Sequence, residues 1–337
     1  MNRFDYVRPN TVADAIQALR TPASKVLAGG TNLVDLMKYD VDRPAFVIDI
    51  NRLPLKDISV TADGGLRVGA LVSNSDLAWH ETIQERYPLL ASAILAGASP
   101  QLRNAATTGG NLLQRTRCYY FYDPSTACNK REPGSGCSAI GGVNRIHAIL
   151  GASDECIAVH PSDMCVALAA IGASVEVEGP NGKRSIPFPD FHRLPADEPH
   201  RDNNMSTGEL ITAVVLPPSD FGNNYTYLKI RDRLSYAFAL VSVAVGLKLK
   251  GDLIEDAQVA LGGVAHKPWR DLVCEELLKG QKPEAPLFLQ FANQVLATAK
   301  GQGQNDFKIE LARRAIVRAL TQAATGTPQD QSNKTIK

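Results

Sequence analysis

The stretch that decides the fold reads Lys25-Val26-Leu27-Ala28-Gly29-Gly30-Thr31-Asn32-Leu33-Val34. Its apolar start predicts a short strand, and helical spacing resumes after the glycines. A second strand at 45–50 would complete a small β-α-β-like unit. Paired glycines at a strand-to-helix turn let the backbone approach a ligand and leave N–H groups free to hold a pyrophosphate. An ordinary tight turn can have the same two residues, so the pair alone decides nothing about function.

A second turn of the same type reads Thr107-Thr108-Gly109-Gly110-Asn111-Leu112-Leu113, about eighty residues further along. Two such turns could grip one elongated dinucleotide from two sides. Thr31, Asn32, Thr108 and Asn111 can supply side-chain hydrogen bonds to it. The chain contains neither Gly-x-Gly-x-x-Gly nor Gly-x-x-x-x-Gly-Lys-Ser/Thr. That disfavours the nicotinamide and nucleoside-triphosphate folds.

Four of the six cysteines lie in one Gly- and Arg-rich stretch with the spacing C-x9-C-x8-C-x18-C. They are Cys118, Cys128, Cys137 and Cys156. Four thiolates are what an iron–sulfur cluster requires, and nearby basic residues would offset the charge of an anionic cluster. A structural zinc ion could use the same thiolates. Zinc sites usually contain two cysteines a few residues apart, and this stretch has no such pair, so the spacing favours the cluster.

The remaining cysteines and nearby histidines have simpler interpretations. Cys165, within an apolar run, and Cys274 are expected to be buried core residues. His147 and His160 could each replace a thiolate ligand, although packing within loops is the plainer role. His266 is expected in a surface turn. No Ser-His-Asp set or pair of carboxylates with catalytic spacing is present, so we expect no catalytic residue in this chain.

Composition excludes several classes of function. The 337 residues are 44% hydrophobic and 21% charged, with a net charge of +1, which gives no electrostatic case for nucleic-acid or membrane binding. No apolar run is long enough to span a bilayer, and the start of the chain has no apolar signal-peptide segment. Export would therefore depend on a partner that carries a signal. Disulfides are not expected in a large chain of this kind.

The clearest linker is Pro217-Pro218-Ser219-Asp220-Phe221-Gly222-Asn223-Asn224. After it, three strand-like runs precede three helical ones, which predicts an α+β domain with a three-stranded antiparallel sheet covered on one face. The strands are expected at 225–231, 237–248 and 253–263, and the helices at 267–279, 286–300 and 306–324. The polar tail at 326–337 is expected to be disordered.

Together, the two Gly-Gly turns and the C-terminal block resemble the FAD-binding subunit of molybdenum hydroxylases, the xanthine dehydrogenase superfamily. The resemblance extends from Phe4 to about Ala324. It implies an α+β fold: a two-lobed FAD-binding domain of the vanillyl-alcohol-oxidase (PCMH) type, then a small α+β domain like that of CO dehydrogenase flavoproteins. The domains would span 1–221, with lobes at about 1–60 and 61–221, and 222–325.

The resemblance also implies which residues hold FAD. The first turn would wrap the pyrophosphate with Val26, Leu27, Ala28, Gly29, Gly30, Thr31, Asn32, Leu33 and Val34. Thr108, Gly110 and Asn111 would hold the ribityl and flavin side. Asp163 would approach from the far side of the cysteine stretch, and Lys229 from the C-terminal domain. Many relatives carry an acidic residue and an aromatic one where this chain has Ser235-Tyr236, so contacts there differ.

The cysteine stretch is similar to an insertion in the FAD subunit of the bacterial periplasmic aldehyde oxidoreductase subfamily. That insertion, at about 114–158 here, would hold an extra [4Fe–4S] cluster on Cys118, Cys128, Cys137 and Cys156. The β subunit of 4-hydroxybenzoyl-CoA reductase also carries such an insertion. The runs 119–123 and 129–133 fit the aldehyde branch better.

The resemblance therefore implies an electron-transfer subunit. A large partner with molybdenum cofactor would oxidise an aldehyde to the carboxylic acid, and a small partner would carry [2Fe–2S] clusters. This chain would pass their electrons through FAD to an external acceptor, within a heterotrimer exported folded to the periplasm by a signal-bearing partner, or otherwise cytoplasmic. Alternatives are an aromatic acyl-CoA reductase subunit, a zinc-stabilised scaffold subunit without flavin, and a stand-alone flavoprotein oxidase.

Overall fold

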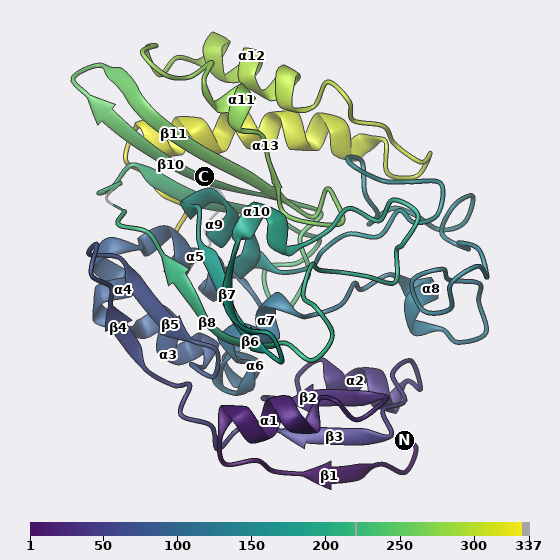
Figure 1. The fold of residues 1–337 in the computed structure, drawn as a ribbon. Helices are drawn as coiled ribbons and strands as arrows, with labels where there is room; N and C mark the ends of the chain where they lie inside the picture. The colour runs from purple at the N-terminus through teal and green to yellow at the C-terminus, as the bar shows by residue number, and fades with distance from the viewer. Residues whose placement is uncertain (220, 332–337) are drawn as a thin grey trace.

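The N-terminal lobe is a small three-stranded parallel sheet with two helices. The computed structural model describes residues 1–219 and 221–331, and this lobe lies at the bottom of the view in Figure 1. The strand order is β1-β3-β2, and Thr11 caps the first helix by accepting a hydrogen bond from the Asp14 amide at 3.1 Å. The elements are β1 (Asp5–Val7), α1 (Val12–Ala18), β2 (Ser24–Leu27), α2 (Leu33–Lys38) and β3 (Phe46–Asp49). The expected β-α-β unit is confirmed.

The second lobe is a five-stranded antiparallel sheet of order β4-β5-β8-β6-β7, packed with short helices. In α9, every residue after Asp163 is buried. The helix is therefore apolar all round, as a helix enclosed on every side must be. The elements are β4 (Ile58–Val60), β5 (Leu66–Gly69), α3 (Asn74–Trp79), α4 (Glu81–Arg86), α5 (Pro88–Ala96), α6 (Pro100–Ala105), α7 (Thr108–Leu112), α9 (Asp163–Ile171), β6 (Ser174–Gly179), β7 (Gly182–Pro187), α10 (Phe188–Phe191) and β8 (Leu210–Leu216).

The cysteine stretch is a long loop region between α7 and α9. It contains one short helix, α8 (Tyr119–Tyr122), and its remaining backbone is held by turns and two isolated bridges, Cys128 with Cys137 and Ser153 with Cys156. The region around α8 projects to the right in Figure 1. A segment with so little regular structure depends on other contacts to fix its cysteines.

The C-terminal domain is an antiparallel sheet of order β12-β11-β10-β9. Figure 1 shows α12 and α13 along one face, while α9 packs against β10 and β11 from the other side. Both faces of the sheet are thus covered, one of them by the second lobe. The elements are β9 (Tyr225–Ile230), β10 (Val241–Lys250), β11 (Leu253–Gly262), β12 (Trp269–Arg270), α11 (Leu272–Glu275), α12 (Ala285–Val295) and α13 (Phe307–Ala324).

Two expectations for this domain were wrong in part. The helix expected at 267–279 is replaced by the short strand β12 and the four-residue α11, because Asp271 accepts hydrogen bonds from the amides of Val273 and Cys274 and so begins the helix there. The tail is ordered as far as the structure describes it. The Gln329 amide donates to Thr226 Oγ1 at 2.9 Å, and Gln331 Nε2 donates to the Tyr227 carbonyl at 2.9 Å. The rest of the predicted disordered tail, 332–337, lies outside the described residues.

Lys308 ties the cysteine stretch to the C-terminal domain. Its side chain is fully buried at the start of α13, and Nζ donates to the carbonyls of His147 at 2.7 Å and Gly263 at 2.6 Å. Asn305 Nδ2 donates to the same His147 carbonyl at 3.1 Å.

Within the described residues, no helix is both long and apolar enough to cross a membrane.

We expect Lys308→Met to lower the free energy of unfolding by about 2 kcal/mol or more, because buried carbonyls lose their donor while the volume is kept. Urea denaturation of both proteins measures the change. Lys300→Met, at an exposed lysine, is the control and should change stability by less than about 0.5 kcal/mol. Equal effects of the two substitutions would contradict this role for Lys308.

Candidate functional site

A cavity of about 610 Å³ lies between the N-terminal lobe and the second lobe. Both Gly-Gly turns contribute to its wall, the second through Gly109 and Gly110. Seven of the nine residues predicted in the first turn line it, namely Val26, Ala28, Gly29, Gly30, Thr31, Asn32 and Leu33. Leu27 and Val34 are not part of the wall. The structure therefore brings together the two turns that the sequence singled out.

Glycine is required at both positions of the first turn. A Cβ at Gly29 would stand 1.8 Å from the carbonyl oxygen of Ala105, so the turn packs backbone against backbone at the end of α6. Gly30 has a φ of +72°, in the left-handed region that side chains disfavour. These constraints fix the shape of the cavity wall at the turn.

The second turn forms the start of α7. Thr107 caps this short helix, its hydroxyl accepting from the Gly110 amide at 3.2 Å. The Thr108 hydroxyl donates to the Val72 carbonyl at 3.0 Å and is buried, so in this structure its hydrogen bond is internal. Asn111 Oδ1 accepts from Ser162 Oγ at 2.5 Å. Of the three residues predicted here, Gly110 lines the cavity, and Thr108 and Asn111 support it from behind.

Asn32 offers an unused donor in the cavity wall. Its Oδ1 accepts from the Arg115 amide at 3.0 Å, whereas its Nδ2 is buried and has no partner among the described residues. Buried polar atoms are nearly always hydrogen-bonded in folded proteins. An orphan amide donor in a cavity wall is what a polar ligand such as a dinucleotide would satisfy.

A second cavity of about 320 Å³ lies between the second lobe and the C-terminal domain. Ser162 and Asp163 are part of its wall, and the Ser162–Asn111 hydrogen bond connects this wall to the second Gly-Gly turn. Asp163 accepts from Tyr227 Oη at 2.6 Å and from Lys229 Nζ at 2.8 Å. The structure thus pairs the two residues predicted on the far side, with Lys229 behind Asp163 and not in the wall.

All four predicted cysteines line one small pocket, together with Phe121, Lys130 and their neighbours. Among the described residues, no three of the four sulfurs lie within 4.8 Å of one another. Burial raises the pKa of the Cys118 thiol to about 12 and that of Cys156 to about 11. These thiols would be protonated unless a metal centre displaced their protons.

The histidines of this region differ from expectation. His147 Nε2 lies 3.1 Å from Cys118 Sγ, whereas His160 is not in the cysteine pocket and instead lies against His192, with ring centroids 4.3 Å apart and the rings tilted by 51°. His266 was expected in a surface turn, which is wrong. It is buried, and its Nδ1 donates to the Arg193 carbonyl at 2.8 Å. Cys165 and Cys274 are buried, as expected.

Asp202 links the pocket to the larger cavity, and nothing in the sequence pattern indicated it. It lines the cavity and accepts from Arg115 Nε at 2.8 Å and from Lys130 Nζ. The Lys130 side chain is only 1% exposed. Burial by itself would raise the pKa of Asp202, but the charges of Lys130 and Arg115 outweigh it and hold that pKa well below the usual range.

We expect Asp202→Asn to lower the free energy of unfolding at pH 7 by about 3 kcal/mol, because Lys130 stays buried without its counter-charge. A carboxyl group whose pKa is lowered by folding stabilises the folded state at pH values above the pKa that it has in the unfolded chain. This contribution is lost as the pH falls below that unfolded pKa. The difference between the two proteins should therefore hold from pH 7 to 5 and narrow below about pH 4.

Denaturation across this pH range measures the difference. Asp232→Asn, which breaks an exposed pair with Arg145, is the control and should cost less than about 1 kcal/mol. A difference of that small size at Asp202, or one that does not depend on pH, would show that the buried network is not held by this charge.

Comparison with known proteins agrees with this geometry. Residues 2–219 match the family described as the FAD binding domain in molybdopterin dehydrogenase, and residues 225–323 match the CO dehydrogenase flavoprotein C-terminal domain. The chain is 51% identical over 325 residues to the aldehyde oxidoreductase FAD-binding subunit PaoB of Escherichia coli K12, covering 96% of this chain and 99% of that one. It is 28% identical to the glyceraldehyde dehydrogenase medium chain of Sulfolobus acidocaldarius, covering 95% and 96%.

The fold is also that of a solved relative. Carbon monoxide dehydrogenase from Hydrogenophaga pseudoflava superposes with a TM-score of 0.76 at 25% identity, covering 96% of this chain and 98% of that one. The two-lobed FAD-binding domain and the small C-terminal domain expected from the sequence are thereby confirmed. The chain belongs to the FAD-binding medium subunits of the molybdenum hydroxylases, the xanthine dehydrogenase family.

Proposed function

We propose that this chain is the FAD- and [4Fe–4S]-carrying electron-transfer subunit of a molybdenum-dependent aldehyde oxidoreductase. The observation that carries the proposal is the pocket that gathers all four cysteines. It occurs in a chain 51% identical, over nearly its whole length, to a protein named an aldehyde oxidoreductase FAD-binding subunit. The substrate chemistry would belong to a partner, so no catalytic residue is assigned here.

The two cavities fit FAD. The first turn, with the orphan Nδ2 of Asn32, would hold the pyrophosphate, and Gly110 with Asn111 would hold the ribityl side. The Asn111–Ser162 hydrogen bond joins the second Gly-Gly turn, which borders the first cavity, to the wall of the second, and one elongated ligand would occupy both. Asp163, oriented by Tyr227 and Lys229, would border its far end. FAD, when bound, supplies reversible redox chemistry, and these residues bind and orient it.

The cysteine pocket fits an iron–sulfur cluster better than a single zinc ion. Four thiolates around one zinc would lie about 4 Å apart, because each Zn–S bond is about 2.3 Å long. Among the described residues, no three of these sulfurs lie within 4.8 Å of one another, and four thiolates are the ligands that a [4Fe–4S] cluster uses. Lys130 beside the pocket would offset negative charge on the cluster, and His147 can donate a hydrogen bond to Cys118 Sγ.

The remaining parts of the proposal rest on the relatives. A large subunit with molybdenum cofactor and a small subunit with [2Fe–2S] clusters would complete a heterotrimer, from which this chain would carry electrons to an external acceptor. A periplasmic location, reached by export with a signal-bearing partner, belongs to the same proposal. So do the domain limits at 1–221 and 222–325 and the cysteine insertion at about 114–158.

We expect Cys137→Ser to reduce the bound iron well below the about four per chain of the unchanged protein, because the cluster loses one of its four thiolate ligands, while FAD stays bound. Iron and flavin quantitation on anaerobically purified protein measures both. Cys274→Ser, a buried cysteine in the C-terminal domain, is the matched control and should keep both cofactors. Full iron retention in the Cys137→Ser protein would refute the ligand assignment.

We expect Gly30→Val to reduce FAD occupancy at least tenfold, because the added side chain would crowd Val34 and Leu27 and distort the turn that would hold the pyrophosphate. Left-handed strain alone could unfold the chain, so the control must carry the same strain. Gly64→Val meets this condition: Gly64 has a φ of +87°, faces open space and is not in either cavity wall. Equal flavin content in the two folded variants would remove the first turn from the binding site.

A further inference from the structure

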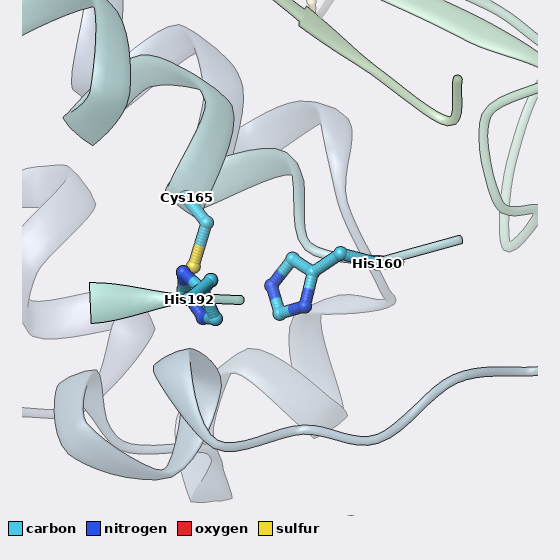
Figure 2. Close-up of side chains that lie close together, drawn as sticks. All are labelled: His160, Cys165 and His192. Carbon is cyan, nitrogen blue, oxygen red and sulfur yellow. The ribbon is translucent and has the colours of Figure 1, made fainter. Parts of the chain in front are cut away.

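Three metal-ligating side chains converge beside the second cavity, outside the cysteine pocket. They are His160, in the loop before α9, Cys165 on α9, and His192, directly after α10. One potential ligand atom from each residue lies within 4.8 Å of the other two. Figure 2 shows the side chains pointing toward one another, with the sulfur of Cys165 next to the ring of His192 and the ring of His160 facing them.

The histidines leave two buried nitrogens without partners. His160 Nε2 and His192 Nδ1 are buried and make no hydrogen bond among the described residues. His192 Nε2 donates to the Leu112 carbonyl at 2.9 Å, which places the proton on Nε2 and the lone pair on Nδ1. A carbonyl that accepts from the other ring nitrogen and so fixes the tautomer is typical of a metal-ligating histidine.

The surroundings suit a cation that takes nitrogen and sulfur ligands. His192 is 3% exposed and Cys165 is 0% exposed. Two neutral imidazoles and a thiolate are ligands that zinc accepts in tetrahedral sites. His160 also lines the second cavity, from which an ion could enter and a water could fill the fourth position.

We propose that His160, Cys165 and His192 bind one Zn²⁺ ion. Binding releases the proton of the Cys165 thiol to solvent, and sulfur and the two nitrogens become ligands, with no change of oxidation state. The ion cross-links the loop before α9, α9 itself and the end of α10. Since Ser162 in that loop bonds Asn111, and Asp163 follows it, the ion would hold the segment on which both cavity walls depend.

The test is metal uptake by the full-length chain with Cys118, Cys128, Cys137 and Cys156 all replaced by serine, so that the cysteine pocket offers no thiolate to the probe. Co²⁺ serves as the probe, because a thiolate ligand gives it a charge-transfer band, and Zn²⁺ then displaces it. We expect one Co²⁺ per chain with this band, and at least a tenfold lower uptake after Cys165→Ser or His192→Phe. Cys274→Ser is the control and should keep full uptake.

Several results would overturn the site. These are a folded chain that takes up no ion, a charge-transfer band that survives Cys165→Ser, or a band lost on Cys274→Ser. One copper in place of zinc per chain in the purified protein would overturn the choice of ion. Circular dichroism of each variant confirms that it is folded. The site uses none of the four cysteines of the proposed cluster, so replacing those cysteines should remove iron and leave this uptake unchanged.

Discussion

A single carboxylate, that of Asp202, compensates the two cations that fix the cofactor-binding segments. Lys130 comes from the cysteine stretch and Arg115 from its start, and both donate to Asp202. The Arg115 amide also donates to Asn32 in the first Gly-Gly turn. Removing one partner of a buried ion pair leaves an uncompensated charge, which is strongly destabilising. The relative position of the cavity and the cysteine pocket therefore depends on this one network.

A second ion pair has the same role at the opposite end of the site. Lys229 on β9 reaches Asp163 at the start of α9 and so joins the C-terminal sheet to the second lobe. Its side chain is 3% exposed, so the ion pair is buried and fixes the position of β9 relative to the start of α9. Between the two networks, the Asn111–Ser162 hydrogen bond joins the second Gly-Gly turn to the segment before α9. Buried polar contacts thus fix the positions of the segments that would hold FAD and of those that would hold the cluster, and keep them close together.

The sequence predicted the parts of the fold that depend on local pattern. Hydrophobic periodicity located the β-α-β unit, α9 and the three long strands. The four cysteines that were grouped by their spacing line one pocket. It could not predict Asp202, whose importance comes from partners 72 and 87 residues away. It placed His266 at the surface, because burial of a polar group beside distant neighbours leaves no periodic signal. The helix expected at 267–279 does not form as one element, because the cap at Asp271 begins a shorter helix and overrides the helix propensity of the residues before it.

The central claim is that one chain holds flavin and an iron–sulfur cluster in adjoining sites. The most direct measurement is the absorption spectrum of anaerobically purified full-length protein, with iron and flavin quantified on the same sample. The account predicts flavin bands together with about four irons per chain. A folded protein that lacks either iron or flavin when both are supplied would contradict it.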